Sequence, residues 1–172
     1  MIKETIGVDT SNIEENVLQE LAERPQWVCW RLEERQGKLT KVPYTPSGDR
    51  ASSTDLRTWS TFDAAMDAYE LSGYDGVGFV FSSGDPYVGI DLDKCRDPET
   101  SEIAPWAQRI IDCVQEGYIE ASPSGSGVHI IVEGAVRDGG RSRRKVHVDG
   151  EVVGEIEMYS RGRFFTVTGE VL

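Results

Sequence analysis

Hydrophobic and polar residues follow two periods along the chain, one typical of helices and one typical of strands. Apolar side chains at helical spacing predict helices over Ser11–Glu23, Leu56–Gly73 and Ile103–Gly117. Alternating or continuous apolar runs between turn residues predict strands over Gln26–Glu34, Gly37–Tyr44, Gly76–Phe81, Tyr87–Asp93, Tyr118–Ser122, Val128–Gly134, Glu151–Ser160 and Arg163–Gly169. The short turns RQG and SSGDP predict two hairpins, and the whole order predicts an α+β fold with mostly antiparallel pairing.

Length and composition indicate one globular domain. The chain has 172 residues, with a polar lead-in over 1–12 and one expected domain over 13–172. It stops just after a strand, so we expect it to be the front part of something longer. No apolar run approaches the ~20 residues that span a bilayer, and the start lacks a secretion signal. We therefore expect a cytoplasmic protein without a membrane partner.

The charge of the chain is strongly acidic but unevenly distributed. Its 18 basic and 30 acidic residues leave a net charge of −12, which opposes non-specific binding of nucleic acid. Basic residues nevertheless gather in one short stretch, at Arg137, Arg141, Arg143, Arg144 and Lys145. The cysteines Cys29, Cys95 and Cys113 form no CxxC pair, so we expect neither a zinc site nor a disulfide framework.

Two aspartates interrupt the apolar run YVGIDLD. Asp91 and Asp93 are two residues apart on a predicted strand, so both side chains project from the same face. Neighbouring carboxylates repel one another unless a cation lies between them, and oxygen ligands suit Mg²⁺ or Mn²⁺. The alternative is an exposed pair on a solvated sheet face.

The segment EASPSGSGVHIIV joins a small-residue turn to a histidine. Residues such as Ser124, Ser126 and Gly127 let the backbone approach a ligand closely, and amides in such a turn can bind an anion. His129 follows directly and should lie within reach of whatever the turn holds. The alternative is a half-buried histidine with a structural role.

A further acidic pair lies in EIEMYSRGRFF. Glu155, Glu157 and Tyr159 share one face of their strand, and either glutamate would complete a cation site with Asp91 and Asp93. Alternation alone does not choose between the two glutamates. Arg163 is the natural candidate for a phosphate contact.

In their order, these motifs resemble the catalytic domain of the archaeo-eukaryotic primase superfamily, of the primase-polymerase type found in plasmids and viruses. That family shows DxD or DxE on an apolar strand, then a small-x-His motif, then an apolar residue with a third carboxylate. Here these are GIDLD, SGSGVH and IE, and flanking segments extend the resemblance over about residues 26–169. Some relatives carry a zinc-binding insertion, for which this chain lacks the cysteines.

The resemblance implies a fold, a set of roles and a set of partners. The fold would be an RRM-like antiparallel catalytic sheet with helices, plus an N-terminal α/β module. The metal-binding catalytic carboxylates would be Asp91, Asp93 and Glu157, holding two Mg²⁺ or Mn²⁺ ions without zinc. The nucleotide contacts would be His129, Ser124, Ser126, Gly127, Arg163 and Lys41. The substrates would be NTP or dNTP and a single-stranded or primed DNA template, and a fused or separate helicase is an expected partner.

Two other functions fit the same residues. Clustered carboxylates with a histidine would also serve a metal-dependent nuclease or phosphodiesterase. A non-catalytic DNA- or nucleotide-binding module of a replication initiator would bind the same ligands without turnover. The basic stretch would contact template phosphate in the polymerase reading and would be a solvated turn otherwise.

The acidic composition generates a first prediction. Lysine occupies only five of the basic positions, and an acidic excess with few lysines is typical of a surface adapted to high salt. We expect a higher melting temperature in molar salt than in dilute buffer, because salt screens the repulsion among the carboxylates. Equal thermal stability in the two solutions would contradict the hypothesis.

Overall fold

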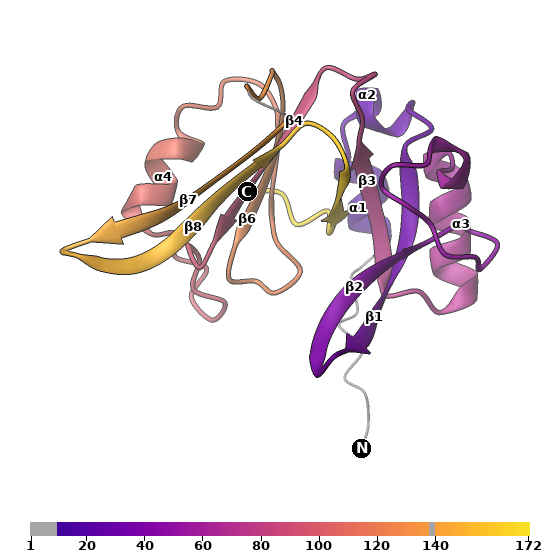
Figure 1. Ribbon diagram of the computed structural model, residues 1–172, viewed down its shortest axis with the longest axis horizontal. Coiled ribbons are helices and arrows are strands. Elements are labelled where there is room, and N and C mark those ends of the chain that lie inside the picture. Colours follow the sequence, from indigo (N-terminus) through magenta and orange to yellow (C-terminus); the bar gives the residue numbers. More distant parts are fainter. Residues whose placement is uncertain (1–9, 138–139) are drawn as a thin grey trace. The chain divides into compact units, whose positions relative to one another are not determined.

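The computed structural model describes residues 10–137 and 140–172, and these residues form two compact units (Figure 1). Unit 1 contains the described residues up to Val80 together with Thr166–Gly169. Unit 2 contains the described residues of Phe81–Phe165 together with Glu170–Leu172. Each unit combines a sheet with helical segments, so the α+β prediction is confirmed.

Unit 1 is built around a sheet in which β1 is central. The strands follow the order β2-β1-β3-β9, and β1 pairs antiparallel with both β2 and β3. The elements of unit 1 and its sheet are α1 (Thr10–Asn16), α2 (Gln19–Ala22), β1 (Trp27–Arg35), β2 (Lys38–Tyr44), η1 (Leu56–Thr58), α3 (Phe62–Ser72), β3 (Gly76–Phe81) and β9 (Arg163–Val167). Of β9, only Thr166 and Val167 belong to unit 1. Trp27 is fully buried, and its ring meets Phe62 and Phe79 edge-on at 4.7 and 5.5 Å, which joins α3 to the sheet.

The helices are shorter than the sequence pattern predicts. The first predicted helix is divided into α1 and α2, and the second begins only at Phe62. Ser60 exchanges backbone hydrogen bonds with Trp27, which keeps this segment extended, and the Thr61 hydroxyl then accepts from the Ala64 amide as an N-cap. Gly73, in the left-handed region, ends α3 as predicted.

Unit 2 contains the sheet that carries the predicted catalytic motifs. Its strands follow the order β5-β6-β4-β8-β7, and each neighbouring pair is antiparallel. The elements are β4 (Tyr87–Asp93), α4 (Pro105–Ile111), β5 (Tyr118–Ala121), β6 (Val128–Glu133), β7 (Arg141–Val148) and β8 (Glu151–Tyr159). The predicted strands are confirmed, and the basic stretch contributes a further one, β7.

The predicted hairpin between β3 and β4 is wrong. The two strands belong to different sheets, because β4 is hydrogen-bonded by β6 on one edge and by β8 on the other. No edge of β4 remains for β3. The turn between them is closed locally instead, since the Asp85 carboxylate accepts hydrogen bonds from the amides of Ser82 and Tyr87.

One face of the unit 2 sheet is covered by α4 (Figure 1). Trp106 and Ala107 of this helix pack with Leu92, Val128 and Ile130 in a buried cluster. Trp106 of α4 can approach β8 closely because residue 154 is glycine. A Cβ atom there would lie 2.5 Å from the Trp106 ring and 2.7 Å from the Asp93 carbonyl oxygen. The apolar residues of β4 and β6 therefore occupy this face, and their polar neighbours occupy the other.

Within the described ranges, no helix has both the length and the apolar character needed to cross a bilayer.

Candidate active site

A row of acidic and basic side chains crosses the polar face of the unit 2 sheet. The strand register places Glu120 opposite His129 and His129 opposite Asp91. It also places Asp91 opposite Glu157 and Glu157 opposite Arg143. Directly paired residues share a face, with Cβ atoms about 4.5–5.5 Å apart. The row, which we call the central row, thus brings together residues from widely separated parts of the chain.

A second row lies next to the central row on the same face. Asp93 is opposite Glu155, and Glu155 is opposite Lys145. Asp93 is exposed, whereas Asp91 is partly buried. Both glutamates that alternation left open therefore stand across from an aspartate. Glu157 differs from Glu155 in being buried and in belonging to the row that contains His129.

Glu157 is surrounded by donors and positive charges. Its side chain is 9% exposed, and its Oε2 accepts a hydrogen bond from the Tyr159 hydroxyl. Arg143 Nε is 3.1 Å and Arg141 Nη2 is 3.7 Å from its Oε1, and Arg163 Nη2 is 4.0 Å from Oε2. A carboxylate is costly to bury without such partners, so these contacts offset part of the cost of burying Glu157.

Tyr159 is fixed as a hydrogen-bond donor. Burial and the hydrogen bond to Glu157 raise the pKa of the Tyr159 hydroxyl to about 12, so it keeps its proton at neutral pH. The guanidinium groups of Arg163 and Arg141 lie 4.9 and 5.5 Å from the centre of its ring. Both guanidinium groups therefore lie near the Tyr159 ring and near the Glu157 carboxylate to which its hydroxyl donates.

Arg143 bridges the two rows. Its Nε and Nη2 lie 2.5 and 2.6 Å from the two carboxylate oxygens of Glu155, a bidentate pair. This hydrogen bonding raises the pKa of Arg143 and lowers that of Glu155. Arg143 is half exposed, so the pair contributes little net stability.

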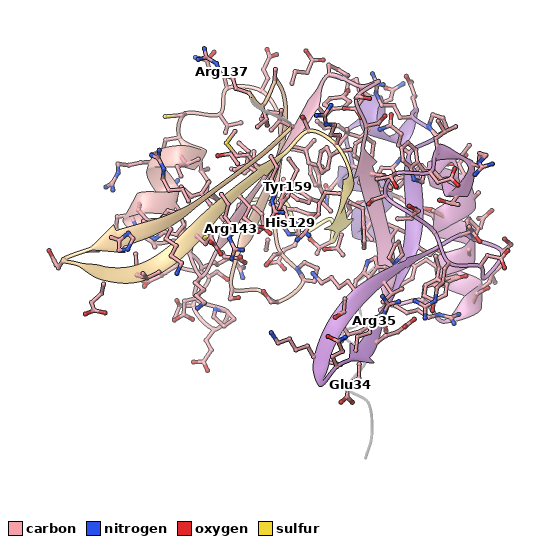
Figure 2. The ribbon with its side chains drawn as sticks, viewed as in Figure 1. Glu34, Arg35, His129, Arg137, Arg143 and Tyr159 are labelled. Carbon is pink, nitrogen blue, oxygen red and sulfur yellow. The ribbon has the colours of Figure 1, made fainter. Side chains whose placement is uncertain are left out.

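His129 lies on the other side of Asp91. Its Nε2 is 3.9 Å from Asp91 Oδ1, and its Nδ1 is 3.3 Å from Glu120 Oε1. Phe165 stacks on the imidazole, with ring centres 4.8 Å apart, and meets Tyr159 edge-on at 6.2 Å. Figure 2 shows His129, Arg143 and Tyr159 gathered in one region of the unit.

The serine-rich turn between β5 and β6 is closed by its own hydrogen bonds. The hydroxyls of Ser122, Ser124 and Ser126 form a chain with oxygen separations of 3.1 and 2.9 Å. The amides of Gly125, Ser126 and Gly127 all donate within the turn, so they do not form the open amide nest that the composition suggests. What the turn offers a ligand is its hydroxyl groups.

This turn is tied to the end of β4. The carbonyl of Ser126 accepts from the amides of Cys95 and Arg96. At Gly127, a Cβ atom would lie 2.8 Å from the Leu92 carbonyl oxygen, so only glycine permits this contact. The turn is therefore held close to the strand that carries both aspartates.

The basic stretch divides between the two faces of the sheet. Arg141, Arg143 and Lys145 lie opposite Tyr159, Glu157 and Glu155, on the polar face. Arg144 lies opposite Ile156 and therefore on the other face. Arg137 is exposed and, in Figure 2, lies apart from His129 and Arg143. The positive charge next to the central row thus comes from alternate residues of β7.

Lys41 belongs to unit 1, whereas the other candidate residues belong to unit 2. It lies on β2, donates a 3.3 Å hydrogen bond to the Thr166 hydroxyl and has its Nζ 5.7 Å from the centre of the Trp30 ring. Its predicted role as a substrate contact stays a prediction.

No family model matches the chain. The chain is, however, 38% identical over 152 residues to a protein described as a DNA primase-polymerase, from Nitratiruptor phage NrS-1. The match covers 88% of this chain and 20% of the relative. The chain contains a primase-polymerase-type domain. This confirms the resemblance seen in the three motifs. The chain spans only about a fifth of the length of the curated relative it matches.

The carboxylates of the primase-polymerase domain suit a hard divalent cation by their chemistry. Asp91 and Asp93 offer oxygen ligands on one face, and Glu157 stands directly across from Asp91. Among the residues that the structure describes, no three acidic, histidine or cysteine side chains stand together as a formed metal site. Glu157 instead contacts Arg143 and Tyr159, so it would have to exchange these partners to reach a cation.

Sequence reasoning missed several residues of this site. Glu120 carries the same sequence signal as Asp91, because each is an acidic residue between apolar neighbours on a strand. The side chain of Arg96 is 6% exposed, and its guanidinium donates to the Gly125 carbonyl, the Ser101 hydroxyl and the Glu170 carboxylate. Phe165 reads as an ordinary core residue, because nothing in sequence relates it to His129.

The contact between Tyr159 and Glu157 generates a prediction. Tyr159→Phe should lower the free energy of unfolding by about 1–3 kcal/mol, because a buried carboxylate loses a donor. A double-mutant cycle with Glu157→Gln, measured by chemical denaturation, should give a coupling energy of about 1 kcal/mol. Additive effects would show that the hydroxyl and the carboxylate do not interact.

The same contact has a defined pH dependence. The pKa of Tyr159 is raised on folding from about 10 to about 12, so its contribution is present below pH 10 and is lost as the pH rises toward 12. The stability difference between the wild type and Tyr159→Phe should therefore shrink over that interval. A difference that stays constant would contradict the raised pKa.

Proposed function

We propose that the domain transfers nucleotides from NTP or dNTP to a primer on a DNA template, in plasmid or viral replication. The observation that carries the proposal is the position of Asp91, directly between His129 and Glu157 in the strand register. The similarity to a phage protein described as a DNA primase-polymerase supports the same chemistry.

The proposed cation site uses the carboxylates of Asp91, Asp93 and Glu157, with Mg²⁺ or Mn²⁺ as the ions and two ions expected. Such ions, when bound, supply Lewis acidity to an attacking hydroxyl and charge neutralisation to a leaving pyrophosphate. The carboxylates themselves position the ions on one face of a rigid sheet. Because Leu92 between the aspartates is fully buried, their spacing is fixed by the strand.

The proposed triphosphate site uses residues on both sides of Asp91. His129 would contact the phosphates through Nε2, the ring nitrogen that faces Asp91. The hydroxyls of Ser124 and Ser126, held near the end of β4 with Gly127, would donate to phosphate oxygens. Arg163 would contribute positive charge from the side of Glu157, and Lys41 is proposed as a weaker substrate contact.

Substrate binding would rearrange the charges around Glu157. Phosphate groups compete with carboxylates for guanidinium, because both accept bidentate hydrogen bonds. A phosphate that takes Arg143 or Arg141 would remove one of the three guanidinium groups around the Glu157 carboxylate. The less compensated negative charge would then favour a metal ion, so cation and phosphate would bind cooperatively.

The proposed template contact is the basic side of β7. Arg141, Arg143 and Lys145 present their charges on the polar face, and Arg137 and Arg144 add charge elsewhere in the same stretch. Phosphate contacts of this kind position a strand without reading its sequence. A fused or separate helicase would supply the open template, and the cytoplasm is the expected place of action.

Removal of the aspartates tests the reaction. Asp91→Asn and Asp93→Asn should each reduce primer extension with dNTP and Mg²⁺ or Mn²⁺ by roughly 10³-fold or more, because the ion loses a ligand. Both variants should stay folded, since neither removes a core contact. Asp149→Asn, at an exposed turn, is the matched control and should retain full activity.

The same assay separates the competing functions. Lengthening of a labelled primer supports the polymerase, shortening without dNTP would favour a nuclease, and binding without turnover would favour a non-catalytic module. Full extension activity in Asp91→Asn would overturn the proposal.

Neighbouring basic residues test the template contact. Lys145→Ala should weaken binding of single-stranded DNA and reduce the slope of log affinity against log salt by about 1, because one phosphate contact is lost. Arg144→Ala, the adjacent residue on the other face, should change both quantities much less. Equal losses in the two variants, measured by fluorescence anisotropy across salt concentrations, would show that the face does not matter.

A further inference from the structure

The polar face contains a buried acidic residue to which the proposed reaction assigns no part. Glu120 lies on β5, and only 1% of it is exposed. Its Oε2 accepts a 2.7 Å hydrogen bond from the Tyr118 hydroxyl, and its Oε1 is 3.3 Å from His129 Nδ1. Burying a carboxylate costs free energy, so the buried position of Glu120 next to His129 Nδ1 needs a physical reason.

The contacts around His129 define both the plane and the direction of its ring. Phe165 stacks on one face of the imidazole at an interplanar angle of 26°, which fixes the plane. The bare backbone of Gly89 makes room for this ring, since a Cβ atom there would lie 2.7 Å from Phe165. The Glu120 carboxylate lies next to Nδ1, and Nε2 points toward Asp91.

We propose that Glu120 is a positioning residue, which holds His129 with Nδ1 protonated and Nε2 directed at the nucleotide phosphates. An ionised carboxylate can only accept a hydrogen bond, so the proton between the two groups belongs to Nδ1. A phosphate oxygen also only accepts, so the ring that contacts a phosphate carries a second proton on Nε2. Tyr118 in turn orients Glu120. The inference rests on the proposed function for the ligand of Nε2, but the state of the ring can be measured without it.

The wild-type protein provides the first test. Long-range ¹H–¹⁵N spectra report which ring nitrogen carries the proton, and the chain has only two histidines. His147 lies exposed on β7 and serves as the internal reference for a ring without a carboxylate behind it. We expect the neutral ring of His129 to carry its proton on Nδ1. A neutral ring protonated on Nε2 would overturn the proposal, whether or not the protein extends primers.

Substitution provides the second test. Glu120→Gln keeps the shape of the side chain but can also donate, so the ring should populate both tautomers. The KM for dNTP should rise roughly tenfold, by analogy with the loss of a carboxylate that orients a metal-bound histidine, while kcat changes less. Tyr118→Phe should give a smaller rise of the same kind, and Glu133→Gln, at an exposed position of β6, should give none.

These measurements separate a positioning role from a purely structural one. A structural role would lower the melting temperature of Glu120→Gln while leaving the tautomer and KM unchanged, and that result would overturn the proposal. If the wild type shows no extension at all, the proposed function fails, while the ring nitrogen still decides the role of Glu120.

Discussion

The site depends on the pairing of β4 with a strand on each of its edges. Because β6 and β8 both run antiparallel to β4, Asp91 has a direct neighbour on either side, His129 and Glu157. The buried cluster beneath β4, built on Leu92 and Trp106, fixes which face of the strand points away from α4. A slip of one residue would turn both aspartates into this apolar layer, so core packing enforces the arrangement of the polar face.

Each end of the central row contains a buried glutamate, and the two glutamates are stabilised by different partners. At one end Glu120 is buried against His129 and Tyr118, and the imidazole supplies a directional hydrogen bond. At the other end Glu157 is held by Tyr159 and by guanidinium groups that carry permanent charge. The first arrangement is buried and directional, which suits the proposed positioning of a ring. The second is exchangeable, because phosphate competes for arginine, and suits a carboxylate that changes partners.

The acidic composition and the basic strand are compatible for a local reason. A net charge of −12 repels nucleic acid at long range, but screening limits that field to about 8–10 Å at ordinary salt. Contacts within a few ångströms are then decided by the residues that face the site. On β7 these are Arg141, Arg143 and Lys145, which strand alternation places beside the carboxylates.

The sequence by itself determined every strand except β7, the shared face of Asp91 and Asp93, and the motif order that resembles the primase-polymerase family, because these follow from local periodicity and spacing. Strand alternation alone could not choose between Glu155 and Glu157, a choice that came from the family resemblance. The sequence could not exclude a hairpin between β3 and β4 or assign a partner to Glu120. Those outcomes depend on which strands become neighbours, and strand pairing is set by the packing of the whole unit. Only the tertiary structure, through the register of β5, β6, β4, β8 and β7, decided which of these side chains meet.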